Sequence, residues 1–123
     1  MTKAKKFDLE PRTAKFAVNV IKFCRKLRQN QLNDILVKQL LRSTTSIGAN
    51  YAEANGAISR QDFKNKICLC RKEAKETMYW LQLVAETDPL FASNCRQLWK
   101  EAQEQVFIFS AIIRTTKKNL IKN

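Results

Sequence analysis

Residues that break helices are scarce in this chain, and this scarcity limits the folds open to it. Only two glycines and two prolines occur in 123 residues, and runs of β-branched residues are short. Hairpin-rich and βαβ folds need many turns, which glycine and proline commonly supply. The sequence therefore predicts an almost entirely helical protein.

Apolar residues recur every three or four positions in four long segments, as in amphipathic helices. The first segment covers residues 11–29, because proline suits a first helical turn and the polar stretch RQNQLN follows. Asn33 or Asp34 can cap the second, which extends to about Asn55 or Gly56. The first two predicted helices thus lie in the first half of the chain.

Two further helices are predicted in the second half of the chain. Ser59 can cap the third helix, and Asp62 three residues later resembles a capping box. Asp88 can cap the fourth, with Pro89 in its first turn and an end near Lys118. Four such helices joined by short turns predict an all-α fold, an antiparallel up-down-up-down four-helix bundle.

The size and composition of the chain predict one domain. A hydrophobic content of 45% is enough for one packed core. We expect residues 1–10 to form a flexible basic arm and residues 11–123 to form the bundle. The sequence has no apolar stretch of the ~18 residues that a membrane span needs, and its start lacks the apolar run of a signal peptide. We therefore expect a cytoplasmic protein without a membrane partner.

The charge of the chain is strongly positive, with 23 Lys and Arg against 11 Asp and Glu. Such an excess favours RNA or DNA as a partner, although it also fits a basic surface that only keeps the protein soluble. Residues 11–29 hold six basic residues and no acidic one. We predict phosphate contacts from one group in or near the first helix and another in the fourth: Lys15, Lys22, Arg25 and Lys26, and Lys100, Arg114 and Lys118.

Phe107 departs from the core pattern of the fourth helix and lies near Lys100, Ala111, Arg114 and Lys118 on the helical wheel. An aromatic ring among basic residues can stack on a nucleobase. A protein interface, or a surface ring covered by lysine side chains, explains Phe107 as well. The sequence leaves these three interpretations open.

The third helix carries apolar residues on two opposite sides. Its core side is expected to contain Ile67, Cys70 and Leu81, and the opposite side carries a second set. A helix that is apolar on two sides is expected to bury both. The second set is our predicted oligomer interface, unless its tryptophan only covers a loop or a terminus: Leu69, Trp80 and Leu83.

Groups that bind metals or perform catalysis are hard to assemble from these residues. The chain has no histidine, and Cys68 and Cys70 are splayed by about 200° on a helix, so they cannot hold one ion together. We expect the four cysteines to be free, buried thiols in a reducing compartment. Glu73 and Glu76 are expected to pair with neighbouring lysines on the surface. We therefore predict a protein that is not an enzyme, with no catalytic residue, metal or cofactor.

The stretch SIGANYAEA, residues 46–54, combines helix formers with polar groups. We expect Ser46, Asn50 and Glu53 to form a partly buried structural network, with Arg71 or Lys64 as a donor to the glutamate. A site carboxylate is the functional alternative for Glu53. A separate strip contains small residues: Thr45, Ala49, Ala52 and Gly56. These residues would let another helix approach closely, either within the bundle or between subunits.

Three blocks of this sequence resemble a known family. They are R-S-x-x-S-I-x-x-N-x-A-E-A at residues 42–54, S-x-x-D-F at 59–63 and K-E-A-x-E-T-x-Y-W-L at 72–81. In order and spacing they resemble bacterial four-helix-bundle proteins encoded in intervening sequences of large-subunit ribosomal RNA genes. The commonest family form has Asn-Ile-Ala-Glu-Gly, where this chain has Tyr51 and Ala54 in place of the isoleucine and the glycine.

The resemblance implies a four-helix bundle that assembles into a ring-like homopentamer. It also implies kinship with the accessory variability determinant of diversity-generating retroelements, a basic bundle that works with a reverse transcriptase and its nucleic acid. Together with the charge, it leads us to expect a noncatalytic oligomer that associates with RNA or DNA, with a nucleic-acid enzyme as a partner. A protein-interaction scaffold without a nucleic-acid role is the alternative.

Overall fold

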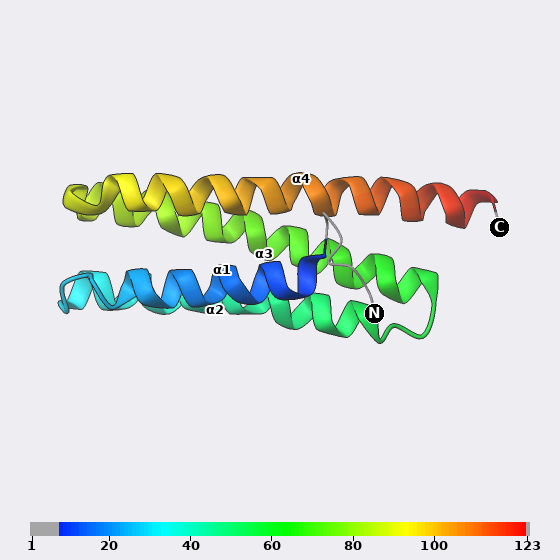
Figure 1. Ribbon diagram of the computed structural model, residues 1–123, viewed down its shortest axis with the longest axis horizontal. Helices are drawn as coiled ribbons and strands as arrows, with labels where there is room; N and C mark the ends of the chain where they lie inside the picture. The colour runs from blue at the N-terminus through cyan, green and yellow to red at the C-terminus, as the bar shows by residue number, and fades with distance from the viewer. Residues whose placement is uncertain (1–7, 123) are drawn as a thin grey trace.

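The computed structural model describes residues 8–122, with side chains through residue 119. Within this part of the chain, four α-helices and one short 3-10 helix follow one another along the sequence. They are α1 (Leu9–Cys24), α2 (Gln31–Asn55), α3 (Arg60–Thr87), η1 (Pro89–Phe91) and α4 (Ala92–Lys122). Successive helices run in opposite directions (Figure 1). The predicted all-α, antiparallel four-helix bundle is confirmed.

Helix ends differ from the predicted ones where several residues offer similar caps. The side chain of Asn30 caps α2 by accepting a hydrogen bond from the backbone N–H of Asn33, 2.8 Å away. The predicted caps Asn33 and Asp34 are therefore wrong. Asn33 is instead buried and donates through Nδ2 to the carbonyl oxygen of Arg28 at 3.0 Å, which fixes the turn after α1.

The two later turns give one confirmed cap and one correction. Ser59 caps α3 as predicted, because its hydroxyl oxygen accepts from the backbone N–H of Asp62 at 3.0 Å. Asp88 makes no side-chain capping bond, and η1 separates it from α4. At the other end of the chain, α1 begins at Leu9 and ends at Cys24, both earlier than expected. The predicted arm of residues 1–10 lies mostly outside the described residues.

The core follows the predicted apolar stripes of all four helices. α3 packs extensively against α2 and α4, whereas α1 packs mainly on α2 and meets α4 over a short stretch. Among the described residues, no helix has the length and apolar character that a membrane span requires. The completely buried side chains of the core include Leu9, Val20, Leu40, Ile47, Ile67, Leu81 and Phe109.

A glycine permits the close approach of α1 and α2. A Cβ atom added at Gly48 would lie 3.3 Å from Thr13 Oγ1 and 3.6 Å from Thr13 Cβ. Gly48 thus brings the two helices together, and the predicted small-residue strip does not. All four residues of that strip are exposed in the bundle, because they lie on the outer side of α2: Thr45, Ala49, Ala52 and Gly56.

Candidate nucleic-acid interface

The first predicted basic group lies on and just after α1, and all its members are exposed. Lys15 and Lys22 are on the helix, whereas Arg25 and Lys26 are in the turn, since α1 ends at Cys24. The ion pairs found among the described residues involve other side chains. Their positive charges therefore face solvent without a carboxylate partner in the described part of the bundle.

A cleft of about 450 Å³ separates α1 from α4 beside this group. Lys15 and Asn19 of α1 line it together with Gln97 of α4. Arg12 spans the cleft and donates two hydrogen bonds to Glu101 of α4, at 2.7 and 2.9 Å. The cleft thus combines amide groups and a lysine with one fixed ion pair.

The Arg12–Glu101 pair is matched in charge. The hydrogen bond that Arg12 donates to Glu101 raises the pKa of Arg12. Burial alone would raise the pKa of Glu101, but hydrogen bonds from Arg12 and Gln105 outweigh burial, and the pKa of Glu101 is lowered. Glu104 lies 3.6 Å from Arg12 and shares its charge. Arg12 therefore offsets the charge of Glu101 and contacts Glu104, and no lysine of α1 is used in these ion pairs.

The second predicted group, on α4, is exposed but spread along the helix. Lys100 lies on the side of α4 that faces α3, because it lines a space between these two helices together with Gln82 and Glu86 of α3. Arg114 and Lys118 lie on the part of α4 that extends past the beginning of α1 (Figure 1). The structure therefore does not join the second predicted group to the first.

The residues of the predicted oligomer interface differ in exposure. Leu69 is 38% exposed, whereas Trp80 and Leu83 are partly buried and pack against the core. Trp80 donates its indole N–H to Glu76 at 3.3 Å, and its ring lies edge-on to Tyr79 at a centroid distance of 5.0 Å. These residues form an aromatic and aliphatic surface on the outer side of α3.

Arg42 of α2 stands between the two glutamates that we expected to pair with lysines of α3. It contacts Glu73 at 3.3 Å and also binds Glu76. The predicted lysine partners are wrong, because an arginine from the neighbouring helix reaches both carboxylates with its forked donors. Sequence spacing along α3 alone gives no sign of this pairing between helices.

The predicted network of Ser46, Asn50 and Glu53 does not form one unit. Ser46 and Asn50 donate to backbone carbonyl oxygens one turn earlier, at 2.7 and 2.8 Å. Glu53 is exposed and pairs with Lys66 at 2.8 Å. The predicted donors to Glu53 are wrong, since Arg71 instead reaches Ser110 of α4. An exposed, paired Glu53 does not have the environment of a site carboxylate.

A buried hydroxyl cluster between α2 and α3 was missed by sequence reasoning. Thr77 donates to Ser43 Oγ at 2.9 Å, and Ser43 donates to the carbonyl oxygen of Leu40. Thr44 Oγ1 lies 3.5 Å from Thr77 Oγ1. All three hydroxyl side chains are completely buried. The signal was present, because Ser43 and Thr77 occupy core positions on their helical wheels.

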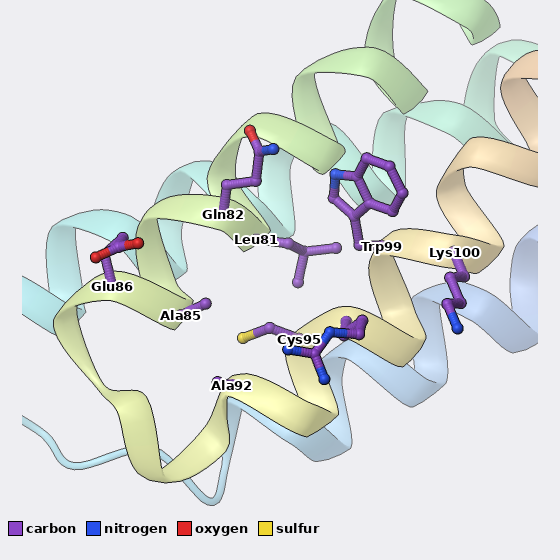
Figure 2. Close-up of a pocket in the computed structure, with 9 residues that line it drawn as sticks. Leu81, Gln82, Ala85, Glu86, Ala92, Cys95, Trp99 and Lys100 are labelled. Carbon is purple, nitrogen blue, oxygen red and sulfur yellow. The ribbon is translucent and has the colours of Figure 1, made fainter.

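A second cleft, of about 490 Å³, lies between α3 and α4 near η1 (Figure 2). Figure 2 shows Cys95 directed toward Ala85 across this space, with Gln82 and Trp99 at its edge. Burial, with a smaller effect of Asp88, raises the pKa of the Cys95 thiol to about 11. The thiol is therefore protonated near neutral pH and is a weak nucleophile there.

Comparisons with known proteins place this bundle in a family. The family model described as 23S rRNA-intervening sequence protein matches residues 5–111. The chain belongs to this family. A solved member of the S23 ribosomal protein family, from Bacteroides thetaiotaomicron, is 36% identical and aligns over 85% of this chain and 96% of its own, with a TM-score of 0.77. That protein is described as having unknown function, and the search of curated proteins gave no match.

Membership in the 23S rRNA-intervening sequence family agrees with the three sequence blocks. Two of these blocks lie in the contact between α2 and α3, where Arg42 meets Glu73 and Glu76 and Ser43 meets Thr77. The blocks therefore carry residues that join these two helices. The description of the family names no reaction.

Proposed function

We propose that this protein is a noncatalytic, self-associating four-helix bundle that binds RNA or DNA through phosphate contacts, as an accessory factor of a nucleic-acid enzyme. The observation that carries the proposal is the exposed basic group of α1 and the following turn. Its four side chains face solvent outside the described ion pairs. Unpaired lysines and arginines on one surface release counterions from a polyanion when they bind it.

The predicted contacts are with the backbone of the nucleic acid. Lys15 and Lys22 lie on a helix beside a cleft with amide groups, and amides and lysines both bind phosphate oxygens. Contacts of this kind fix the position of a nucleic acid without reading its bases. We therefore propose binding with little dependence on base sequence.

Self-association would multiply these contacts. The chain has a net charge of +12, so a pentamer would carry ~60 formal charges around one ring. The proposed interface contains Leu69, Trp80 and Leu83 on the outer side of α3, with Tyr79 beside them. Tryptophan, tyrosine and arginine are the residue types enriched at interface hot spots, and Arg42 lies next to Trp80 through Glu76. The pentamer itself rests on the family resemblance.

The experiment that tests the proposed function reverses three charges together. The variant Lys15→Glu, Lys22→Glu, Lys26→Glu should weaken binding equally for unrelated RNA and DNA sequences. The slope of log affinity against log salt concentration should also become less negative by roughly three, one for each lost phosphate contact. Electrophoretic mobility or fluorescence anisotropy at several salt concentrations measures both quantities.

The matched control reverses three exposed lysines outside both basic groups: Lys38, Lys72 and Lys75. The control variant changes the net charge by the same amount. If the contact surface is on α1, the control should lose clearly less affinity for RNA and DNA. Solution mass should be compared among all three proteins. Equal losses in the two variants, or a loss confined to one nucleic-acid sequence, would contradict the proposal.

A further inference from the structure

The outer side of α4 carries a straight line of exposed cations with one aromatic ring at its centre. Arg96, Lys100, Arg114 and Lys118 are all exposed, and Phe107 is 58% exposed. Their spacings of four, seven, seven and four residues keep them within a narrow strip of a helix. At 1.5 Å per residue the strip is ~33 Å long. We call these five residues the outer strip of α4.

The outer strip does not serve the core of the bundle. The buried residues of α4 include Cys95, Ala102 and Phe109, on the opposite side of the helix. Phe107 therefore exposes a large apolar ring to solvent at a position that the packing of this chain does not require.

The strip is uniformly positive. Its five positions hold no acidic residue, and the nearest carboxylate on the helical wheel, Glu104, is turned to Arg12, with 3.6 Å between Oε1 and Nη2. The ion pairs among the described residues do not include the four cations. The strip thus offers positive charge on both sides of an exposed aromatic face.

We propose that the outer strip of α4 binds single-stranded nucleic acid, with Phe107 stacked on a base and the four cations on neighbouring phosphates. This inference rests on the proposed function and names its substrate class. Stacking on an aromatic ring needs an exposed base face, which a single strand provides. In a duplex both faces of each base are covered by stacked neighbours. The charge complementarity of the strip favours a polyanion over a second, equally basic copy of this chain.

The test compares fluorescence anisotropy of a labelled single strand and a duplex of the same length. An oligothymidine of about 20 nucleotides is long enough to follow a strip of ~33 Å. The Phe107→Ala change should weaken its binding by about 5- to 150-fold, the usual range for loss of one stacked base. Duplex binding should change by less than about twofold, because phosphate contacts are kept.

Two further variants make this result specific. Phe107→Tyr keeps the ring and should restore single-strand binding, while the salt dependence should be unchanged in both variants. Leu90→Ala is the matched control, since Leu90 is another exposed apolar side chain, 77% exposed in η1. It should leave both affinities unchanged. Circular dichroism and solution mass should match the wild-type protein for each variant.

The outcomes separate this inference from the proposed function. If wild-type protein binds both nucleic acids and Phe107→Ala leaves single-strand binding intact, stacking is wrong while phosphate binding stands. Equal losses of affinity for the single strand and the duplex would also overturn stacking. A changed solution mass in Phe107→Ala would overturn it too, because the ring would then pack between subunits. If wild-type protein binds neither nucleic acid, both proposals fail.

Discussion

Single residues decide how closely the helices of this bundle approach one another. At Gly48, the absence of a side chain lets Thr13 of α1 come within 3.3 Å of the place where a Cβ would lie. At Gly56 the nearest such atom is the carbonyl oxygen of Glu53, 3.8 Å away, and the backbone φ of −100° suits any residue. The two glycines therefore have different roles, which sequence alone does not distinguish.

Substitution of the two glycines tests this difference. Gly48→Leu should destabilise the protein by about 1 to 3 kcal/mol, because the larger side chain overpacks the contact with Thr13. Gly56→Ala should leave stability unchanged or raise it by up to about 1 kcal/mol, since the unfolded chain loses freedom. Denaturant unfolding monitored by circular dichroism measures both. Equal effects at the two positions would show that α1 and α2 do not meet at Gly48.

The sequence could predict core residues but not polar partners. Ile47 and Tyr51 lie against the core as predicted, because apolar spacing directly reports the buried side of a helix. The partner of Glu53 was predicted wrongly, since several cations of α3 are within reach and only the packed helices select Lys66. The two basic groups are exposed, as expected from their positions on the polar sides of the predicted helices.

At the scale of elements, α1 makes fewer contacts with the rest of the bundle than the other long helices do. It packs mainly on α2, and Arg12 provides its ion pair to α4 through Glu101. Apolar periodicity predicted that the four helices form, but it did not predict where α1 and α2 begin and end. Asn30, Asn33 and Asp34 are chemically similar caps, and only the buried bond from Asn33 to Arg28 decides among them.

The ion pair between α1 and α4 predicts a pH dependence of stability. The folded-state pKa of Glu101 is lowered below its ordinary value of 4.5. The contribution of ionised Glu101 to the free energy of unfolding is therefore fully present above pH 4.5. It is lost as the pH falls through the lower, folded-state pKa. Glu101→Gln should cost about 1 kcal/mol at neutral pH.

Denaturant unfolding at neutral pH and at about pH 3 tests this contribution. The difference in unfolding free energy between wild-type protein and Glu101→Gln should shrink at the lower pH. A difference that is the same at both pH values would show that Arg12 does not hold an ionised Glu101.

At the scale of the whole molecule, the basic surfaces and the proposed interface lie on different helices. The basic groups belong to α1, the turn after it and α4, whereas Leu69, Trp80 and Leu83 belong to α3. An assembly through α3 would therefore leave the basic surfaces available. The interface on α3 could be predicted from the apolar pattern of that helix, whereas the number of subunits could be predicted only through the family resemblance, because one chain does not reveal how many copies surround it.

The proposed interface is tested by solution mass. Trp80→Glu should reduce the mass of the oligomer, since a buried charge opposes association. Because Trp80 also packs on the core, Leu69→Glu serves as a second variant at a more exposed site. Leu90→Glu, in η1, is the control and should keep the wild-type mass. Unchanged mass in both α3 variants, with intact helical structure, would show that this side of α3 is not the interface.

The central claim is that the basic surface binds phosphate, and the salt dependence of binding tests it most directly. Affinity for unrelated RNA and DNA should be measurable at low salt and should fall linearly with log salt concentration. For duplex DNA the slope should lie between about −4 and −6, for four to seven phosphate contacts per chain. Absence of binding at low salt, or an affinity that salt does not change, would contradict the claim and favour a protein-interaction scaffold.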